Sequence, residues 1–308
     1  MDLKGDTVDP FWKACTIFQE MDYTGANMGI SGLLPMLSFP HLKRLSSRSI
    51  DPFHQTFHSG RHLAWFRQCP NLMQLHWDLD YAPASFDAFA EAMRQGTWAH
   101  LQDLSLVEVS EMDDVLALTF VHLPPLLRFR LQSHLFGWMA LESLQRQLFA
   151  SINILNFSGT YDVSSDMALQ VLQECTHLQD FKTARINAED IDNEERPWAC
   201  LALKRLNAYV RALEGPKNKP AVTSQGFIRP NGTRALQWNL RSGLSQLATL
   251  QNLEVAVFEN TPQDMMKEDI DWMAKNFPAL RQVHGTSSEN AQIKRKLRRL
   301  VRKYDIEH

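Results

Sequence analysis

The sequence lacks the motifs that would assign it a chemistry. Its 308 residues contain no G-x-S-x-G nucleophile motif, no P-loop, no G-x-G-x-x-G dinucleotide motif and no H-E-x-x-H zinc motif. No apolar run approaches the roughly 18 residues that a bilayer-spanning helix needs. The opening residues, Met-Asp-Leu-Lys, also lack the positive-then-apolar order of a signal peptide. We therefore expect an intracellular protein, cytoplasmic or nuclear, whose sequons at Asn156 and Asn231 are unused.

An excess of charge of one sign is missing too. The 32 Lys and Arg residues nearly balance 35 Asp and Glu residues, which gives a net charge of −3. This balance argues against nucleic-acid and membrane partners. The four cysteines include no C-x-x-C pair, so neither a zinc site nor a disulfide framework is indicated. We expect no metal, no cofactor, no small-molecule substrate and no enzymatic activity.

What the sequence does contain is a repeat. Ten times, an apolar residue lies three positions before a second apolar residue, called the anchor here, and the pair opens an L-x-x-L-x-L pattern. The pairs are Cys15/Phe18, Phe39/Leu42, Cys69/Leu72, Trp98/Leu101, Leu123/Leu126, Phe149/Ile152, Cys175/Leu178, Cys200/Leu203, Leu250/Leu253 and Phe277/Leu280. Successive anchors are separated by 24, 30, 29, 25, 26, 26, 25, 50 and 27 residues.

This period indicates leucine-rich repeats, each made of one strand and a returning helical segment. We predict an α/β solenoid, a horseshoe with a parallel concave sheet and helices on the convex side, forming a single domain over 1–308 with about ten to eleven repeats. The helices are expected at 54–68, 85–96, 113–122, 141–150, 165–175 and 264–277. All four cysteines lie three residues before an anchor, so we expect buried free thiols.

Three stretches depart from the repeat. Residues 214–233 are rich in Pro, Gly and Lys and are expected to be an irregular loop or an eroded repeat, with Leu236, Trp238 and Leu240 as its strand. Residues 290–308 contain seven basic residues between Ile293 and Tyr304 and are expected to form a C-terminal cap. His54, His58 and His62 have helical spacing, but no further ligand completes a metal shell, so they are expected on an interface or surface helix.

Binding is expected on the concave face. Side chains two, four and six positions after each anchor project from that face, because neighbours along a strand alternate sides. Acidic and basic members are equal in number, which favours a mixed polar protein-binding surface over a phosphate-binding one. The predicted partner-binding residues are Arg44, Arg48, His76, Asp78, Asp103, Arg128, Arg130, Lys182, Arg205 and Tyr209.

The segments CPNLMQLHW at 69–77, WAHLQDLSL and ERPWACLALKRL resemble the cysteine-containing leucine-rich repeats of F-box proteins, especially those of Mortierella-type fungi. In such proteins the repeats select a substrate, and an F-box that precedes them docks a cullin ubiquitin ligase. The first repeat begins near Phe11, so the F-box itself is not expected within this sequence. The resemblance implies substrate recognition, with ubiquitin-ligase components as indirect partners.

The sequence thus predicts a non-enzymatic protein-interaction module. Two alternatives stay open. One is binding of anionic lipid or nucleic acid through the basic C-terminal helix, and the other is a scaffold that brings proteins together.

Overall fold

The computed structural model describes residues 17–24, 38–48, 68–78, 83–160, 162–193, 196–211, 244–262 and 266–286, with Arg295, Arg298, Arg299 and Arg302. These residues form ten strands that alternate with helices over most of this range, and every described strand pairing is parallel. The prediction of an α/β fold with a parallel sheet is therefore confirmed. The described part of the chain groups into two compact units.

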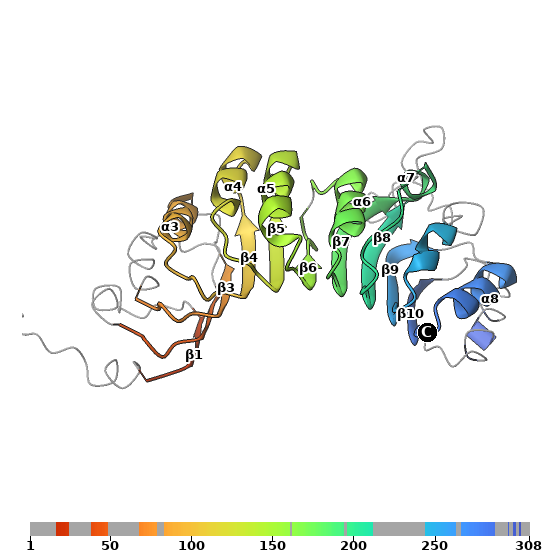
Figure 1. The fold of residues 1–308 in the computed structure, drawn as a ribbon, viewed down its shortest axis with the longest axis horizontal. Helices are drawn as coiled ribbons and strands as arrows, with labels where there is room; N and C mark the ends of the chain where they lie inside the picture. Colours follow the sequence, from red (N-terminus) through yellow and green to blue (C-terminus); the bar gives the residue numbers. More distant parts are fainter. Residues whose placement is uncertain are drawn as a thin grey trace, which may run out of the picture. The chain divides into compact units, whose positions relative to one another are not determined.

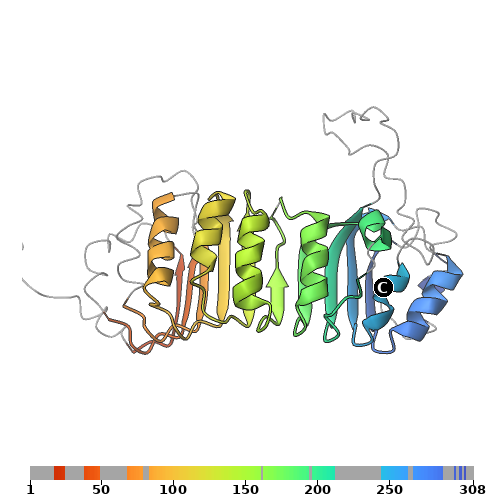
Figure 2. The same cartoon turned by 45° about the horizontal axis from the view of Figure 1, so that its top comes forward.

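The first unit contains five strands and three helices. They are β1 (Glu20–Thr24), β2 (Arg44–Arg48), β3 (Gln74–Asp78), α3 (Pro83–Arg94), β4 (Asp103–Val109), α4 (Asp113–Phe120), β5 (Arg128–Ser133) and α5 (Trp138–Leu148). The strands follow one another in sequence order. Within this unit α3, α4 and α5 lie side by side over one face of the strands, and no described helix covers the other face (Figures 1 and 2).

The second unit repeats this arrangement with β6 (Ile154–Asn156), α6 (Ser165–Glu174), β7 (Asp180–Asn187), α7 (Ala188–Asn193), β8 (Arg205–Arg211), the 3-10 helix η2 (Leu244–Thr249), β9 (Val255–Pro262), α8 (Lys267–Asn276) and β10 (Gln282–Thr286). Its strands are also in sequence order. The five predicted helices that fall mainly on described residues are all present as α3, α4, α5, α6 and α8, whereas α7 and η2 were not predicted. The predicted helix at 54–68 and its three histidines lie outside the described residues.

The apolar pair of each repeat forms a turn that leads into its strand. In seven of the ten pairs the anchor's backbone N–H donates to the carbonyl of the residue three positions earlier, at 3.0–3.3 Å, as for Leu72 and Cys69. Both members are buried in all seven pairs. Pro40, Pro70 and Pro278 occupy the second position of such a turn, where their fixed φ is favoured. The repeated sequence pair is therefore a structural unit in its own right.

The core lies between the strands and the helices. Inward residues of the strands alternate with outward ones, so Leu104, Leu106, Phe129 and Leu131 are fully buried. In the first unit, aromatic side chains fill the space under α3: the Phe89 ring lies 6.0 Å from Trp77, 5.7 Å from Phe86 and 6.3 Å from Trp98. The described helices thus pack against the inward side chains of the strands. The outward side chains of the strands lie on the opposite face, which no described helix covers.

A second regular feature joins each strand to the next. The carbonyl of the residue directly after an anchor accepts two backbone N–H groups of the following repeat, at 2.8–3.1 Å. Gln19, for example, accepts from Lys43 and Arg44. This shared acceptor recurs four times within each unit and aligns the first residues of neighbouring strands, such as Asp103 with Arg128.

The longest interval between anchors lies between β8 and β9. The 50 residues between Leu203 and Leu253 were expected to contain an irregular loop or an eroded repeat. Across this interval β8 pairs directly with β9, with Arg205 opposite Val255, and the Asn252 side chain donates to the Leu201 carbonyl at 2.8 Å. No strand therefore separates β8 from β9. Residues 214–233 and 236–240 themselves lie outside the described part, as does most of 290–308.

Candidate functional site: the open strand face and its edge

The face of the strands opposite the helices is polar and accessible. In the first unit its first row consists of the residues that begin the five strands: Glu20, Arg44, Gln74, Asp103 and Arg128. The second row lies two residues further along: Asp22, Ser46, His76, Ser105 and Arg130. All ten are half-buried or exposed, as the alternation predicts. In this unit the structure thus places Arg44, His76, Asp103, Arg128 and Arg130 of the predicted residues on one surface.

Ion pairs connect neighbours in the first row. Arg44 contacts Glu20 at 2.6 Å, and the Arg128 Nε atom donates to the Asp103 carboxylate at 2.8 Å. Each pair joins residues that lie opposite each other in adjacent parallel strands. Exposed pairs of this kind contribute little to stability, about 0–1 kcal/mol. Their effect here is to compensate the charges of Arg44, Asp103 and Arg128 within the protein.

The charges of the second row are less fully compensated by ion pairs than those of the first row. The His76 Nδ1 atom lies 2.8 Å from the Ser105 hydroxyl oxygen, which fixes the orientation of this ring. Arg130 is exposed, and no described acidic side chain pairs with it. Asp78, the last residue of β3, is half-buried. Arg130 is therefore a cation of the first unit's open face that is available to a ligand.

The second unit carries fewer of the predicted residues. Lys182 is half-buried on β7 and follows Asp180, whose carboxylate lies 3.8 Å from the Arg205 guanidinium. Burial raises the pKa of Asp180 above its usual value, although Arg205 and Lys182 oppose that shift. Arg48 and Tyr209 belong to β2 and β8, but their side chains lie outside the described set.

Glu108 is a residue that the sequence pattern does not predict. Its φ of 58° lies in the left-handed region, at a point where the pairing of β4 with β5 shifts register. The Gln132 side chain donates to Glu108 Oε1 at 2.7 Å, and the His134 Nε2 atom lies 3.8 Å from Oε2. Gln132 of the neighbouring repeat therefore holds this carboxylate by a hydrogen bond, and His134 of the same repeat lies beside it.

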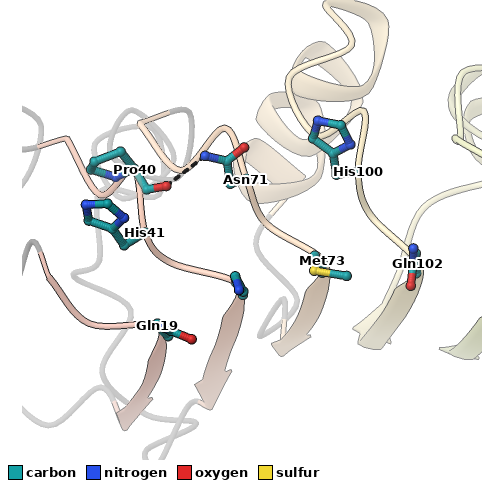
Figure 3. A pocket seen from close by; sticks show the side chains of 8 residues that line it. Gln19, Pro40, His41, Asn71, Met73, His100 and Gln102 are labelled. Carbon is teal, nitrogen blue, oxygen red and sulfur yellow. Dashed lines mark hydrogen bonds between the residues drawn. The ribbon is translucent and has the colours of Figure 1, made fainter.

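A groove runs along the edge of the first unit where the strands begin (Figure 3). It has a volume of about 360 Å³. Seven of its lining residues lie directly before or after the anchors of four successive repeats: Gln19, His41, Lys43, Asn71, Met73, His100 and Gln102. Pro40, two positions before its anchor, completes the lining. Alternation along the strands does not predict this edge, because it concerns only positions from the second residue after the anchor onward.

The three cysteines that the structure describes do not take part in any of these surfaces. Cys69, Cys175 and Cys200 are free and buried, as predicted, whereas Cys15 lies outside the described residues. Burial raises the pKa of Cys69 and that of Cys200 to about 12, and it raises the pKa of Cys175 as well. These thiols are protonated at neutral pH and are poor nucleophiles.

Within the described part of the chain, no group of three metal-binding side chains occurs, and no helix there is long and apolar enough to cross a bilayer. In comparisons with known proteins, the chain matches no family model and no curated protein.

Proposed function

We propose that this chain is a leucine-rich-repeat protein that recognises another protein through the open face of its strands and catalyses no reaction. The regular period of the sequence supports the repeat assignment, as does the recurrent turn between each anchor and the residue three positions before it. The observation that carries the binding role is the open face itself, which is polar, mixed in charge and free of described helices in each unit. Repeat proteins use such extended faces for recognition.

Arg130 is the residue that best tests this role. Arg and Tyr side chains dominate interface energetics, and Arg130 is exposed without a described acidic partner, unlike Arg128. Reversal of its charge in Arg130→Glu is expected to abolish capture of the protein ligand, because the ligand's acidic groups would then meet a carboxylate. The measurement is affinity capture from an extract of the source cells, read by mass spectrometry.

Arg146→Glu is the matched control. Arg146 lies on α5 in the helical layer, where it is 71 % exposed and 3.6 Å from Glu142. The same charge reversal there leaves the open face intact, so capture is expected to persist. Capture that is identical for the wild type and Arg130→Glu, or lost equally in both variants, would contradict binding through the open face.

The resemblance to F-box proteins supports a narrower form of this proposal. In that form the captured ligand is a substrate for ubiquitin ligation, and ligase components bind indirectly through another chain. Their presence among the proteins retained by the wild type would support it, and their absence alongside a specific ligand would favour a scaffold.

A second candidate function rests on the C-terminal arginines. Arg295, Arg298, Arg299 and Arg302 are helical and exposed, and their spacing places them along one side of a helix. Such a stripe is suited to an anionic lipid surface or to nucleic acid. Affinity for either ligand is then expected to fall steeply with added salt, and a flat salt response would exclude this function.

A further inference from the structure

The groove at the strand starts of the first unit is built from two rows of side chains. Residues that directly follow an anchor form one row: Gln19, Lys43, Met73 and Gln102. Residues that directly precede an anchor form the other: His41, Asn71 and His100. Figure 3 shows these side chains arising from successive repeats, with Gln19 and Gln102 at opposite ends.

Several carbonyls along this edge are already engaged. The carbonyls of Gln19, Lys43 and Met73 each accept two N–H groups from the next repeat, and the Asn71 side-chain nitrogen donates to the Pro40 carbonyl at 2.7 Å. Side chains supply the charged and polar groups of the groove. Among them are the Lys43 ammonium group, the imidazoles of His41 and His100, and the amide groups at both ends of the groove.

The charge of the groove has one sign. Its lining contains a lysine and two histidines but no acidic residue. The nearest acidic residues in sequence, Glu20 and Asp103, each contact an arginine of the neighbouring strand rather than a groove residue. Lys43 is exposed, and no described carboxylate pairs with it. The groove is therefore complementary to an anion.

Its dimensions suit an extended chain rather than a single small anion. Four neighbouring strands spaced about 4.8 Å apart span roughly 14 Å, which an extended peptide covers with about four residues. The lining alternates cationic or imidazole groups with amide side chains along this length. Such an arrangement can hold carboxylates and peptide groups of one segment together.

We propose that this groove binds an extended acidic peptide segment. Carboxylates of the segment contact Lys43 and the imidazoles of His41 and His100, while its backbone amides bond to Gln19 and Gln102. This site is distinct from the open face proposed above, since none of its residues lies in the two outward rows.

The corresponding edge of the second unit does not share this character. There the residues directly after the anchors include Glu254 between Lys204 and Arg281 in repeat order, so an acidic residue lies among the basic ones. Lys204 occupies the position that corresponds to Lys43, and both are exposed. Lys204→Glu therefore provides a control with the same charge change at the same place in the repeat.

The test is fluorescence anisotropy with the full chain and fluorescein-labelled hexaglutamate at low salt. We expect binding by the wild type, about tenfold weaker binding by Lys43→Glu because attraction is replaced by repulsion, and a change of less than about twofold for Lys204→Glu. The double variant His41→Gln/His100→Gln is expected to weaken hexaglutamate binding severalfold. It tests the groove proposal if Lys43→Glu does not fold. Circular dichroism and urea midpoints establish that each variant is folded.

Three results would overturn the proposal. The first is hexaglutamate binding that is absent, or that is equal in the wild type and in the folded groove variants. The second is competition by free glutamate at the same carboxylate concentration, which would indicate a small-anion site. The third is tighter binding of a short single-stranded oligonucleotide with the same dependence on Lys43. Because Arg130→Glu leaves the groove intact, failure of ligand capture by the open face is read separately.

Discussion

Alkaline pH is expected to destabilise this protein through its buried thiols. Cys69, Cys175 and Cys200 are 0 % exposed, each at the turn that precedes a strand. Burial raises the pKa of Cys69 and of Cys200 to about 12 and also raises that of Cys175. In the unfolded chain the same thiols titrate near 8.5. Between these values the unfolded state has released protons that the folded state retains.

The sign and size of the effect follow from this difference in bound protons. A pKa that is raised by folding stabilises the folded state below the unfolded pKa, and this contribution is lost as pH rises towards the folded pKa. Each thiol lowers the folding equilibrium constant about tenfold per pH unit in this window, so three thiols lower it about a thousandfold. A free energy of unfolding of about 5–15 kcal/mol, which is ordinary for a domain, would be largely lost within a few pH units.

Urea denaturation at pH 8, 9 and 10 under reducing conditions measures this slope. The matched variant carries Cys69→Ala, Cys175→Ala and Cys200→Ala and keeps Cys15. Its stability at pH 8 is expected to be lower because of the lost side-chain volume, but its pH dependence should be much shallower. Titration of lysines and tyrosines is common to both proteins. Equal slopes for the two proteins would refute the argument, as would rapid reaction of Cys69, Cys175 or Cys200 of the folded wild type with a thiol reagent at pH 8, identified by peptide mapping.

Two further changes test contacts between repeats, with urea unfolding as the measurement. Thr160→Val is expected to cost about 1–3 kcal/mol, because the buried Thr160 hydroxyl donates to the Leu131 carbonyl at 2.8 Å and accepts from the Ser133 N–H; an unchanged midpoint would contradict this role. Asp113→Ala is expected to cost about 1–2 kcal/mol, because the Asp113 carboxylate of α4 accepts three backbone N–H groups at the start of α5, at 2.8–3.0 Å. Asp114→Ala, one residue further on, serves as its control, and equal losses would contradict the capping role.

The helices could be predicted from the sequence where the repeat itself locates them. Spacing of the anchors fixes where each strand begins, and the apolar segments between anchors leave room for α4 and α6, whose predicted starts at residues 113 and 165 agree with the structure. By contrast α5 was predicted to begin at residue 141 but begins at Trp138. The N–H groups of Gly137, Met139 and Ala140 at its start donate to Asp113 of the preceding helix, and local sequence does not reveal a cap supplied by another element.

Candidate site residues were predictable to a similar degree. Alternation along the strands correctly placed Arg44, Asp103 and Arg128 on the open face. Their ion pairs depend on which residues of neighbouring strands lie opposite each other, and the anchor spacing predicts this register once the strands are parallel. The left-handed backbone of Glu108 could not be predicted, because nothing in its sequence neighbourhood requires a non-glycine residue with positive φ. The groove could not be predicted from alternation either, because the residues flanking each anchor belong to neither face of a strand.

The shared carbonyl acceptor after each anchor has a consequence for how such a chain can change. Register between β8 and β9 is set by the Lys204 carbonyl, which accepts from Glu254 and Val255 although twice the ordinary number of residues separates the two anchors. Doubling a connection adds only about 0.6 kcal/mol of closure entropy. The register of the two strands therefore does not depend on the length of the segment that connects them. A folded domain or an epitope inserted within this interval should leave the flanking repeats in place, which makes it a natural point for grafting new modules.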